Sequence, residues 1–537
     1  MEQSSTIAAE TALRRTFAII SHPDAGKTTL TEKLLLYSGM VRTAGMVRAR
    51  KGGKSASSDW MAMEQERGIS ITASAMQFPY KGAIINLLDT PGHQDFSEDT
   101  YRTLTAADSA VMVIDAAKGV EAQTRKLFTV CRLRGIPILT FINKLDLNSR
   151  DPFELVSEVE QVLGIHASPV NWPVGSGRNF AGVADCETHE VHLFTKLEGG
   201  AHRALSKRVT ADNLGDEEKI DPDLVTKIQE DLFLLKEAGN RFDKEKFLRG
   251  LLTPVFFGSA LTNFGVEPFF DKFVELAPCP NATVANGPEG EVIIDPVQDS
   301  FSGFVFKIQA NMNPRHRDSM AFMRVASGQF ERDMTVYHHR QKKEVRLSRS
   351  YSVMAQDRNT VDAAFPGDVV GVINPGLFAI GDTISLTGKN TAKQAFNFKP
   401  MPSFPPEVIA QIRPNDVLRR KAFEKGVKQL CDEGAVQLLR SYEQPDNPPY
   451  VAAVGKLQFD VLQYRLRDEY NVETQLDVLP YQYSAWLEGD PAKLKRPRGA
   501  FLTLDSRDRV VMLFSSEWEK NYTLEQNPGY SLREYVK

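Results

Sequence analysis

The chain has 537 residues, of which 42% are hydrophobic and 25% are charged, values typical of globular proteins. This composition excludes a long disordered or collagen-like protein, and no run approaches the roughly 18 consecutive apolar residues of a membrane-spanning helix. The formal net charge of -4 excludes a protein coated with positive charge for nucleic acid. Any RNA contact must therefore come from local patches of Lys and Arg.

The cysteines and the N-terminal segment indicate a cytoplasmic protein. The four cysteines lie far apart in the sequence without a C-x-x-C pair, which favours neither a zinc site nor a disulfide framework; they are Cys131, Cys186, Cys279 and Cys431. The N-terminal segment lacks the charged-then-apolar pattern of a secretory signal. We therefore expect a cytoplasmic, multidomain protein with neither a membrane nor DNA as a partner.

Residues 1–280 are predicted to form an α/β domain. Its short, bounded apolar runs are typical of buried parallel strands, and the longer segments between them suit crossover helices; the runs are 17–20, 84–88, 110–114 and 138–142. At about 150 residues per domain, the whole length predicts about three to four domains. We expect a mostly parallel sheet with helices on both faces and an insert at about 150–255 whose role the sequence does not reveal.

The remaining chain is predicted to form two further domains. A segment rich in Pro, Gly and Asn at 278–290 indicates a linker. Short apolar segments separated by turns then predict a β-barrel at 295–395. After a second Pro-rich break at 398–407, an α+β domain is predicted at 400–537. Its last sixty or so residues either complete that domain or form a separate appendage.

A phosphate-binding loop is predicted directly after the first apolar run. The segment SHPDAGKTT, residues 21–29, combines a tight turn with Lys-Thr and leads into a helix. Backbone N–H groups at such a helix start, aided by the helix dipole, bind phosphate oxygens. Lys27 is then expected to reach the β- and γ-phosphates, and the Thr28 hydroxyl to bind Mg²⁺. Ser21 stands where the general pattern has its first glycine, so this motif alone is weak evidence.

The end of a second apolar run predicts the acidic side of the same site. The segment INLLDTPGH, residues 85–93, places Asp89 where a carboxylate would face Mg²⁺ through water. Gly92 follows closely, and its missing Cβ would let its backbone N–H approach the γ-phosphate.

The segment FINKLD, residues 141–146, predicts recognition of guanine. In an N-K-x-D pattern, the Asp146 carboxylate accepts hydrogen bonds from both N1–H and the exocyclic amine of guanine, donors that adenine does not offer in that arrangement. Asn143 is expected to tie this loop to guanine and to the phosphate loop, while the stem of Lys144 lies along the base.

A fourth loop, GSAL at 258–261, is expected to bring the Ala260 N–H toward the guanine O6. Four such elements in this order predict a GTP site. The residues expected to contact GTP are Ser21, His22, Pro23, Asp24, Ala25, Gly26, Lys27, Thr28, Thr29, Asp89, Thr90, Pro91, Gly92, His93, Asn143, Lys144, Asp146, Ser259, Ala260 and Leu261.

The segment EQERGISITAS, residues 64–74, resembles the translational GTPases related to elongation factors G and Tu, whose first switch ends in R-G-I-[ST]-I. The resemblance implies that Ser70 joins Mg²⁺ when GTP is bound, so the expected metal ligands are Thr28, Ser70 and, through water, Asp89. It also implies that His93, directly after D-T-P-G, positions the attacking water.

The same resemblance implies roles for three further residues. Ile69 and Pro23 match the apolar positions that flank the histidine, and Asp24 matches the phosphate-loop acid that acts when the ribosome is engaged. The expected catalytic residues are therefore His93, Asp24 and Lys27.

Within these GTPases, the segments 92–121 and 304–334 resemble the bacterial peptide chain release factor 3 family, and the likeness runs from about residue 14 to residue 473. Only about sixty residues follow, too few for the two last domains of elongation factor G, and elongation factor Tu ends in a second barrel instead. A translocase or a tRNA carrier is therefore not expected.

The resemblance implies hydrolysis of GTP to GDP and phosphate with Mg²⁺, slow alone and stimulated by the sarcin–ricin loop of the large ribosomal subunit. The partners implied are both ribosomal subunits and, indirectly, the class-one release factors that the protein removes after peptide release. A monomer is expected.

Two other interpretations stay open: a different ribosome-acting GTPase, such as a recycling or stress factor, and a GTP-timed regulatory module that binds a protein. The basic segment 41–54 is interpreted as switch backbone, with an RNA-binding arm as the alternative.

Overall fold

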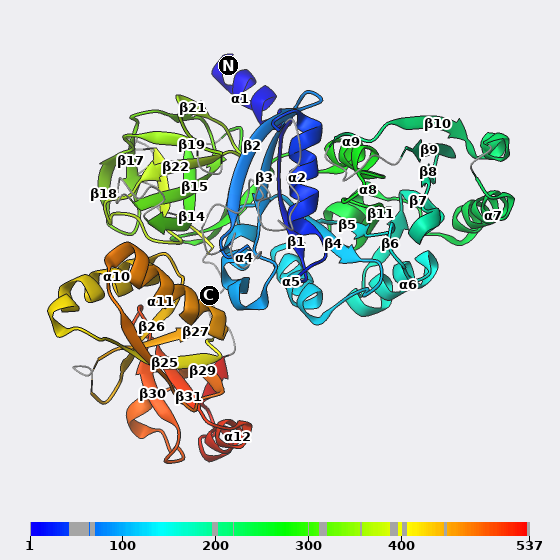
Figure 1. Ribbon diagram of the computed structural model, residues 1–537. Helices are drawn as coiled ribbons and strands as arrows, with labels where there is room; N and C mark the ends of the chain where they lie inside the picture. Colours follow the sequence, from blue (N-terminus) through cyan, green and yellow to red (C-terminus); the bar gives the residue numbers. More distant parts are fainter. Residues whose placement is uncertain are drawn as a thin grey trace.

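The computed structural model describes residues 2–41, 64, 70–195, 202–217, 220–298, 300–310, 319–354, 357–386, 396–399, 405–444 and 448–533. Figure 1 shows an α/β domain in the centre, an insert extending to its right, a β-rich domain at its upper left and an α+β domain below that one. The predicted fold class, a multidomain α/β protein, is confirmed.

The α/β domain contains a sheet with the strand order β2-β3-β1-β4-β5-β11-β6. All neighbours in this part of the sheet are parallel except β2 and β3, which form an antiparallel hairpin. The strands are β1 (Arg14–Ser21), β2 (Ser74–Tyr80), β3 (Ala83–Asp89), β4 (Ser109–Asp115), β5 (Ile138–Asn143), β6 (His166–Pro169) and β11 (Leu252–Phe257). The four apolar runs recognised in the sequence lie within β1, β3, β4 and β5.

Helices cover both faces of this sheet, because its central strands carry apolar side chains on both sides. In β4, Met112 packs into one core with helices α4, α5 and α6, whereas Val111 packs into the other core with α2 and α9. The helices are α1 (Glu2–Leu13), α2 (Lys27–Ser38), α4 (Ser97–Leu104), α5 (Ala122–Arg134), α6 (Pro152–Leu163), α8 (Lys244–Leu248) and α9 (Val266–Leu276), with a short 3-10 turn, η1 (Gln94–Phe96).

The insert forms a small antiparallel sheet covered by one long helix. Its strand order is β10-β9-β8-β7, and the buried Trp172 donates a hydrogen bond from Nε1 to Asp231 Oδ2 at 2.9 Å on the helix. The elements are β7 (Asn171–Val174), η2 (Gly177–Asn179), β8 (Gly182–Asp185), β9 (Glu190–Phe194), β10 (Ser206–Thr210), η4 (Ala211–Asp216) and α7 (Pro222–Ala238).

The β-rich domain closes around its own apolar core. Its strands are β14 (Ser302–Ala310), β15 (Ser319–Ser327), β16 (Phe330–Glu331), β17 (Thr335–His338), β18 (Lys343–Arg346), β19 (Ser350–Met354), β20 (Asp357–Thr360), β21 (Ala363–Ala364), β22 (Val369–Ile373) and β23 (Thr383–Leu386). A three-stranded sheet accompanies them, formed by β12 (Thr283–Gly287), β13 (Gly290–Ile294) and β24 (Asn397–Phe398).

The linker predicted at 278–290 is therefore wrong in part, because strand β12 lies inside it. The Gly- and Asn-rich end of the segment forms the turn of a β12–β13 hairpin. Ala285 in that hairpin is fully buried, and its strand pairs with β24 at Phe398. The partner strand lies more than one hundred residues further along the chain, beyond the reach of local composition.

The barrel is joined to the α/β domain by backbone pairing and by buried polar contacts. Strand β19 pairs with β2, so a single sheet runs from the barrel into the α/β domain. Asp368 of the barrel accepts hydrogen bonds from Arg14, Gln77 and Asn86 at 2.8, 2.8 and 3.1 Å. These donors lie on β1, β2 and β3, so one carboxylate contacts three neighbouring strands.

The α+β domain has one eight-stranded sheet with the order β28-β25-β27-β26-β30-β31-β29-β32. Its elements are β25 (Val408–Pro414), η6 (Val417–Arg419), α10 (Arg420–Asp432), β26 (Gln437–Ser441), β27 (Tyr450–Ala453), α11 (Lys456–Tyr470), β28 (Thr474–Val478), β29 (Tyr483–Glu488), η7 (Pro491–Lys493), β30 (Phe501–Leu504), β31 (Val510–Phe514), α12 (Glu517–Gln526) and β32 (Ser531–Arg533). The C-terminal strands join this sheet where β30 pairs with β26, so the last part of the chain completes the domain instead of forming an appendage.

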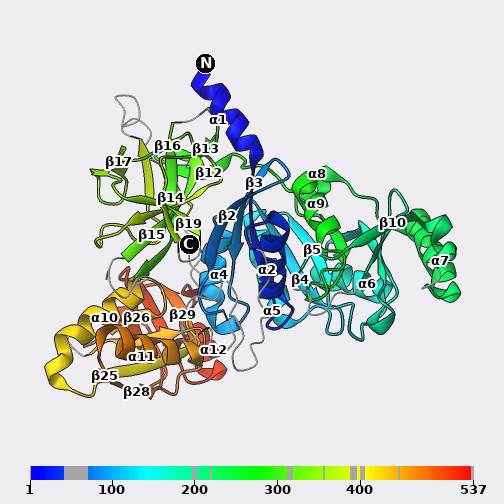
Figure 2. The ribbon, with the colours of Figure 1, turned by 45° about the horizontal axis from the view of Figure 1, so that its top comes forward.

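Figure 2 shows the α+β domain below the β-rich domain, both to the left of the α/β domain. Helix α11 contacts the α/β domain where the Leu457 N–H donates to Asp95 in η1. Across the described residues, no helix is both long and apolar enough to cross a membrane.

Candidate nucleotide site

The phosphate loop connects the buried strand β1 to helix α2, as the motif predicts. Two residues of the loop have a left-handed backbone: Asp24 with φ 64° and Gly26 with φ 94°. A Cβ on Gly26 would lie 2.3 Å from Nδ2 of Asn143, so this position needs a glycine both for its backbone and for space. The loop therefore turns tightly, with the N-terminus of α2 at its end.

The residues expected to bind Mg²⁺ lie together beside this loop. Nζ of Lys27 donates to Oδ1 of Asp89 at 2.6 Å, and both side chains are buried. Oγ1 of Thr28 lies 3.5 Å from Oγ of Ser70. Two hydroxyl oxygens and a nearby carboxylate are hard oxygen ligands of the kind that Mg²⁺ prefers.

This set suits Mg²⁺ better than a metal held by the protein alone. Among the described residues, no group of three or more His, Cys, Asp and Glu side chains could hold a metal ion. Mg²⁺ is commonly held by one or two protein oxygens together with waters and substrate phosphates. The residues present therefore fit an ion that arrives with a nucleotide.

Asn143 joins the base side of the site to the phosphate loop. Its Nδ2 donates to the Ala25 carbonyl at 2.8 Å, and its Oδ1 accepts from the Ala260 N–H at 2.8 Å. The side chain is almost fully buried, so both hydrogen bonds are shielded from water. One amide thus holds three loops, from the ends of β1, β5 and β11, in a fixed arrangement.

Asp146 carries the unpaired acceptor expected of a guanine-binding residue. Its Oδ1 is buried, and it finds no hydrogen-bond partner among the described residues. A buried carboxylate oxygen without a hydrogen-bond donor costs free energy, because its hydrogen bonds to water are lost on burial and no protein donor takes their place. A ligand that brings an N–H donor would remove that cost.

Lys144 is held in place beside Asp146 by a partner that the sequence analysis missed. It has φ 71°, and its Nζ donates to Oδ2 of Asp115 at 2.7 Å. Burial opposes ionisation of Asp115, but the hydrogen bonds from Lys144 and from the Ala117 N–H outweigh it and lower the pKa of the carboxyl. Asp115 is therefore a stable anion that orients the lysine stem.

His93 lies at the edge of the site, with 31% of its side chain exposed. It directly precedes η1, and its Nδ1 accepts from the Asp95 N–H at 3.2 Å. Gly92 lies against the phosphate loop, since a Cβ there would contact the His22 carbonyl and Pro23 Cα at 3.7 Å. The space thus permits a methyl group on its phosphate-loop side, and any need for glycine would come from the bound phosphate.

The remaining predicted residues lie at the ends of β1, β3 and β11. Ser21, His22, Ala25 and Thr90 are buried, and burial lowers the pKa of His22. Thr90 Oγ1 donates to the Ile19 carbonyl at 2.6 Å, and the Pro91 carbonyl accepts from Thr100 Oγ1.

After β11, Ser259 and Ala260 are buried, whereas Leu261 is exposed. Ile69 and most of the basic segment 41–54 lie outside the described residues.

Besides Asp115, one further residue that shapes the site, Glu64, was not recognised in the sequence. Oε1 of Glu64 accepts from the N–H groups of Ile71 and Thr72, at 2.9 and 3.1 Å, and so fixes the backbone after Ser70. Asp115 ends a buried strand as Asp89 does, a signal that could have identified it. Glu64 gives no such signal, because nothing in the local sequence separates it from a surface acid.

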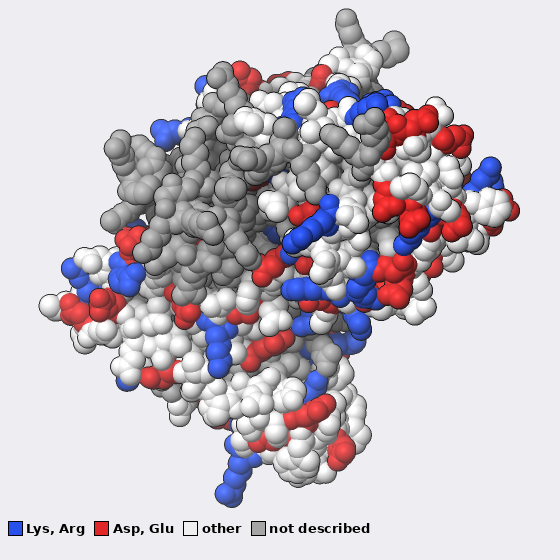
Figure 3. All heavy atoms as spheres, turned by 45° about the vertical axis from the view of Figure 1, so that its right-hand side comes forward, with Lys and Arg blue, Asp and Glu red and all other residues white. Residues whose placement is uncertain are grey.

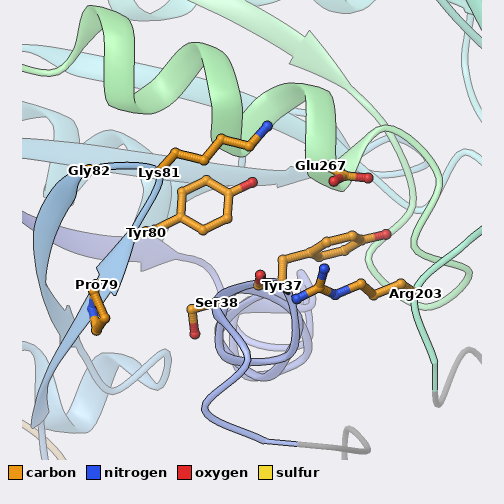
Figure 4. Close-up of a pocket in the computed structure, with 8 residues that line it drawn as sticks. All are labelled: Tyr37, Ser38, Pro79, Tyr80, Lys81, Gly82, Arg203 and Glu267. Atoms are coloured by element: carbon orange, nitrogen blue, oxygen red, sulfur yellow. Dashed lines mark hydrogen bonds between the residues drawn. The ribbon is translucent and has the colours of Figure 1, made fainter.

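A hollow of about 310 Å³ lies at the opposite end of α2 from the phosphate loop. Figure 4 shows the rings of Tyr37 and Tyr80 facing it, with Arg203 and Glu267 at one side. Arg203 donates to the Tyr37 carbonyl at 2.8 Å, and Tyr80 donates to Asp271. No residue expected to contact GTP lines this hollow, so it is separate from the nucleotide site.

Comparison with known protein families covers most of the chain. The model described as "Elongation factor Tu GTP binding domain" matches residues 13–279, and "Elongation factor G domain 2" matches residues 300–387. The model described as "Class II release factor RF3, C-terminal domain" matches residues 398–524.

Curated relatives match over nearly the full length. Peptide chain release factor 3 of Symbiobacterium thermophilum is 53% identical over 523 residues, covering 97% of each chain. Its namesake from Gloeobacter violaceus is 54% identical over 536 residues, covering 98% of each chain. A solved structure from Thermus thermophilus has a TM-score of 0.68 at 22% identity, covering 92% of this chain and 73% of that one, which supports the fold alone.

Proposed function

The chain belongs to the peptide chain release factor 3 family, and we propose on this basis that it is a GTPase of translation termination. The ribosome stimulates its hydrolysis of GTP, and its action promotes dissociation of class-one release factors after the peptide has been released. Full-length similarity at about half identity supports this function.

The observation that carries guanine binding is the buried, unpaired Oδ1 of Asp146 beside the fixed amide of Asn143. Guanine has N1–H and an exocyclic amine on one edge, so it supplies donors for the carboxylate. The Ala260 N–H is already donated to Asn143, which argues against the direct contact to guanine O6 expected from the sequence. Ala260 would instead contribute by holding the loop.

Hydrolysis follows from the placement of charge around the phosphates. Lys27 exchanges its contact with Asp89 for phosphate oxygens, and it stabilises charge that develops during in-line attack by water. Thr28, Ser70 and, through water, Asp89 would hold Mg²⁺, which supplies further charge neutralisation. His93 orients the attacking water, and Asp24 in the phosphate loop takes part when the ribosome is bound.

The proposed partners are both ribosomal subunits, with the sarcin–ricin loop next to His93, and the protein acts as a cytoplasmic monomer. On the face drawn in Figure 3, basic and acidic side chains intermingle, in keeping with the net charge of -4. Binding to ribosomal RNA would therefore use limited patches, which also suits a factor that must leave after each round.

The test is GTP turnover with and without 70S ribosomes, followed by release of a labelled class-one factor from terminated ribosomes. We expect ribosomes to stimulate turnover strongly and the protein with GTP to accelerate factor release. Stimulation without factor release would favour another ribosome-acting GTPase. Absence of stimulation would favour a GTP-timed protein-binding module and would overturn the proposal.

A further inference from the structure

The α+β domain contacts the α/β domain two residues after His93. Oδ2 of Asp95 accepts a hydrogen bond from the backbone N–H of Leu457 at 2.9 Å, across 362 positions of sequence. Asp95 is only 7% exposed, so this contact is shielded from solvent. Leu457 is the second residue of helix α11, and its N–H is one of those that the helix itself leaves unpaired.

Helix α11 has no N-cap side chain to accept from the N–H groups of its first turn, and Asp95 takes that place, while Gln458 of the helix accepts from the Val454 and Gly455 N–H groups before it. The N-cap residue is Gly455, and the second residue of a helix is a usual donor to an N-cap oxygen. The negative charge of Asp95 also suits the positive end of the helix dipole. A carboxylate from the α/β domain therefore caps a helix of the α+β domain.

The contact with Asp95 leaves no room for a side chain at Gly455. A Cβ at this position would lie 2.0 Å from Cγ of Asp95 and within 2.3 Å of both carboxylate oxygens. Its φ of -146° is extended backbone that any residue adopts, so the local conformation does not require glycine. The close approach of Asp95 is what excludes a side chain here.

The same carboxylate also faces the imidazole of His93. Oδ1 of Asp95 lies 3.3 Å from Nδ1 of His93, while the Asp95 N–H donates to that Nδ1 at 3.2 Å. One oxygen of Asp95 thus points to the helix of another domain, and the other points to the histidine. A shift of helix α11 that moves the carboxylate would therefore also change the surroundings of the His93 imidazole.

Neighbouring contacts hold the α+β domain against the segments that follow Ser70 and His93. Phe96 packs with Ile71 and with Val461 of α11 in a small buried cluster. Arg102 of α4 donates to the Gly434 carbonyl of the α+β domain at 3.2 Å. The cap at Asp95 therefore lies inside a packed interface and is more than an isolated surface contact.

We propose that Asp95 is a positioning residue, through which the position of helix α11 against the α/β domain sets the orientation of the His93 side chain. This rests on the proposed function, in which His93 orients the attacking water. When the Leu457 N–H of α11 donates to Asp95, the carboxylate is held beside the imidazole. When α11 moves away, this hydrogen bond breaks and the carboxylate is free to turn. The α+β domain thereby controls how readily GTP is hydrolysed from outside the nucleotide site.

The first test is Gly455→Ala, which disturbs the cap without altering any residue that contacts GTP. We expect ribosome-stimulated single-turnover hydrolysis at saturating ribosomes to fall about 10- to 100-fold, because small misplacement of a reacting group costs that much. GDP affinity should stay within about twofold. The matched control is Gly215→Ala, since a Cβ there meets nothing within 4 Å.

A variant pair separates the proposed contact from a general loss of folding. In the Asp95→Ala background the atoms that a Cβ on Gly455 would meet are gone, so adding Gly455→Ala should lower turnover no further. Independent, multiplying losses from the two changes would overturn the proposal. Asp95→Ala also carries the test if Gly455→Ala alone does not fold.

The second readout follows the His93 imidazole directly, without ribosomes. With all nine histidines labelled with ¹⁵N, the His93 signals are assigned by their loss in His93→Gln. Gly455→Ala should shift the Nδ1 resonance in the same direction as Asp95→Ala, while Gly215→Ala leaves it in place. An unmoved resonance in Gly455→Ala overturns the coupling. Absent ribosomal stimulation of the unmodified protein would instead count against the proposed function.

Discussion

The base side and the hydrolysis side of the nucleotide site are built differently. On the base side, Asn143 bonds to Ala25 and Ala260, and all three belong to the α/β domain. On the hydrolysis side, Asp95 contacts the α+β domain, and Lys307 of the barrel donates to the Ala73 carbonyl just after Ser70. One domain therefore sets the choice of base, whereas three domains meet at the residues that govern hydrolysis.

This difference predicts that base specificity does not depend on the arrangement of the domains, whereas the rate of GTP hydrolysis does. A guanine pocket held by buried hydrogen bonds within one domain should keep its specificity whatever the other domains do. A water-positioning histidine whose neighbours are held by other domains should change its activity when those domains move. Each of the three variants below tests one part of this contrast.

The largest effect is expected for His93→Ala. Removing the group that orients the attacking water should lower ribosome-stimulated turnover about 10²- to 10⁴-fold. GTP and GDP affinities should stay near those of the unmodified protein, because the base side is untouched. Single-turnover hydrolysis and equilibrium nucleotide binding measure the two effects.

The control for that variant is His166→Ala, an exposed histidine on β6 at the edge of the sheet. It should leave both turnover and binding unchanged. A parallel loss of nucleotide affinity in His93→Ala would mean that His93 supports the fold of the site, and the contrast between the two sides would fail.

An intermediate effect is expected for Asp146→Asn. The change replaces an acceptor oxygen by a donor group and removes the charge, and hydrogen bonds to charged groups are worth about 1.5–3 kcal/mol each. GTP affinity should fall about 100-fold, while affinity for xanthosine triphosphate rises. Competition binding with the two nucleotides measures the change in preference.

Asp212→Asn, at an exposed position in the insert, is the matched control and should leave base preference as it is. If Asp146→Asn kept its preference for guanine, the unpaired oxygen would have another role, and the base side would need a different account.

The smallest effect is expected for Lys307→Met. Loss of its contacts with the Ala73 carbonyl and Asp99 should loosen the backbone that follows Ser70. At about 1 kcal/mol for a hydrogen bond, stimulated turnover should fall about fivefold with guanine preference unchanged. The control is Arg332→Met, which breaks an exposed ion pair on the same barrel. A changed base preference in Lys307→Met would contradict the separation of the two sides.

Much of the fold and site was predictable because the informative signals are local. Buried parallel strands read as short apolar runs, and the turns that follow them carry the phosphate and base motifs within a few residues. The loop at 21–29 and the loop at 141–146 could therefore be recognised separately, and the order of the motifs along the chain brought them together.

What was missed depends on pairing between distant segments. Strand β12 was mistaken for part of a linker because β24, its partner, lies far along the chain. The place of the last strands follows from the pairing of β30 with β26, which their own composition does not reveal. Asp95 looks like any acid near a turn until Leu457 is placed beside it.

The continuous sheet between the barrel and the α/β domain has a mechanical consequence. Strand β2 begins at Ser74, four residues after Ser70, and Met76 within it pairs with Met354 of the barrel. Asp368 adds a second attachment at Gln77 of the same strand. The barrel is thus attached to that strand at two positions. A rotation of the barrel would therefore be transmitted through β2 to the segment that carries the Ser70 hydroxyl.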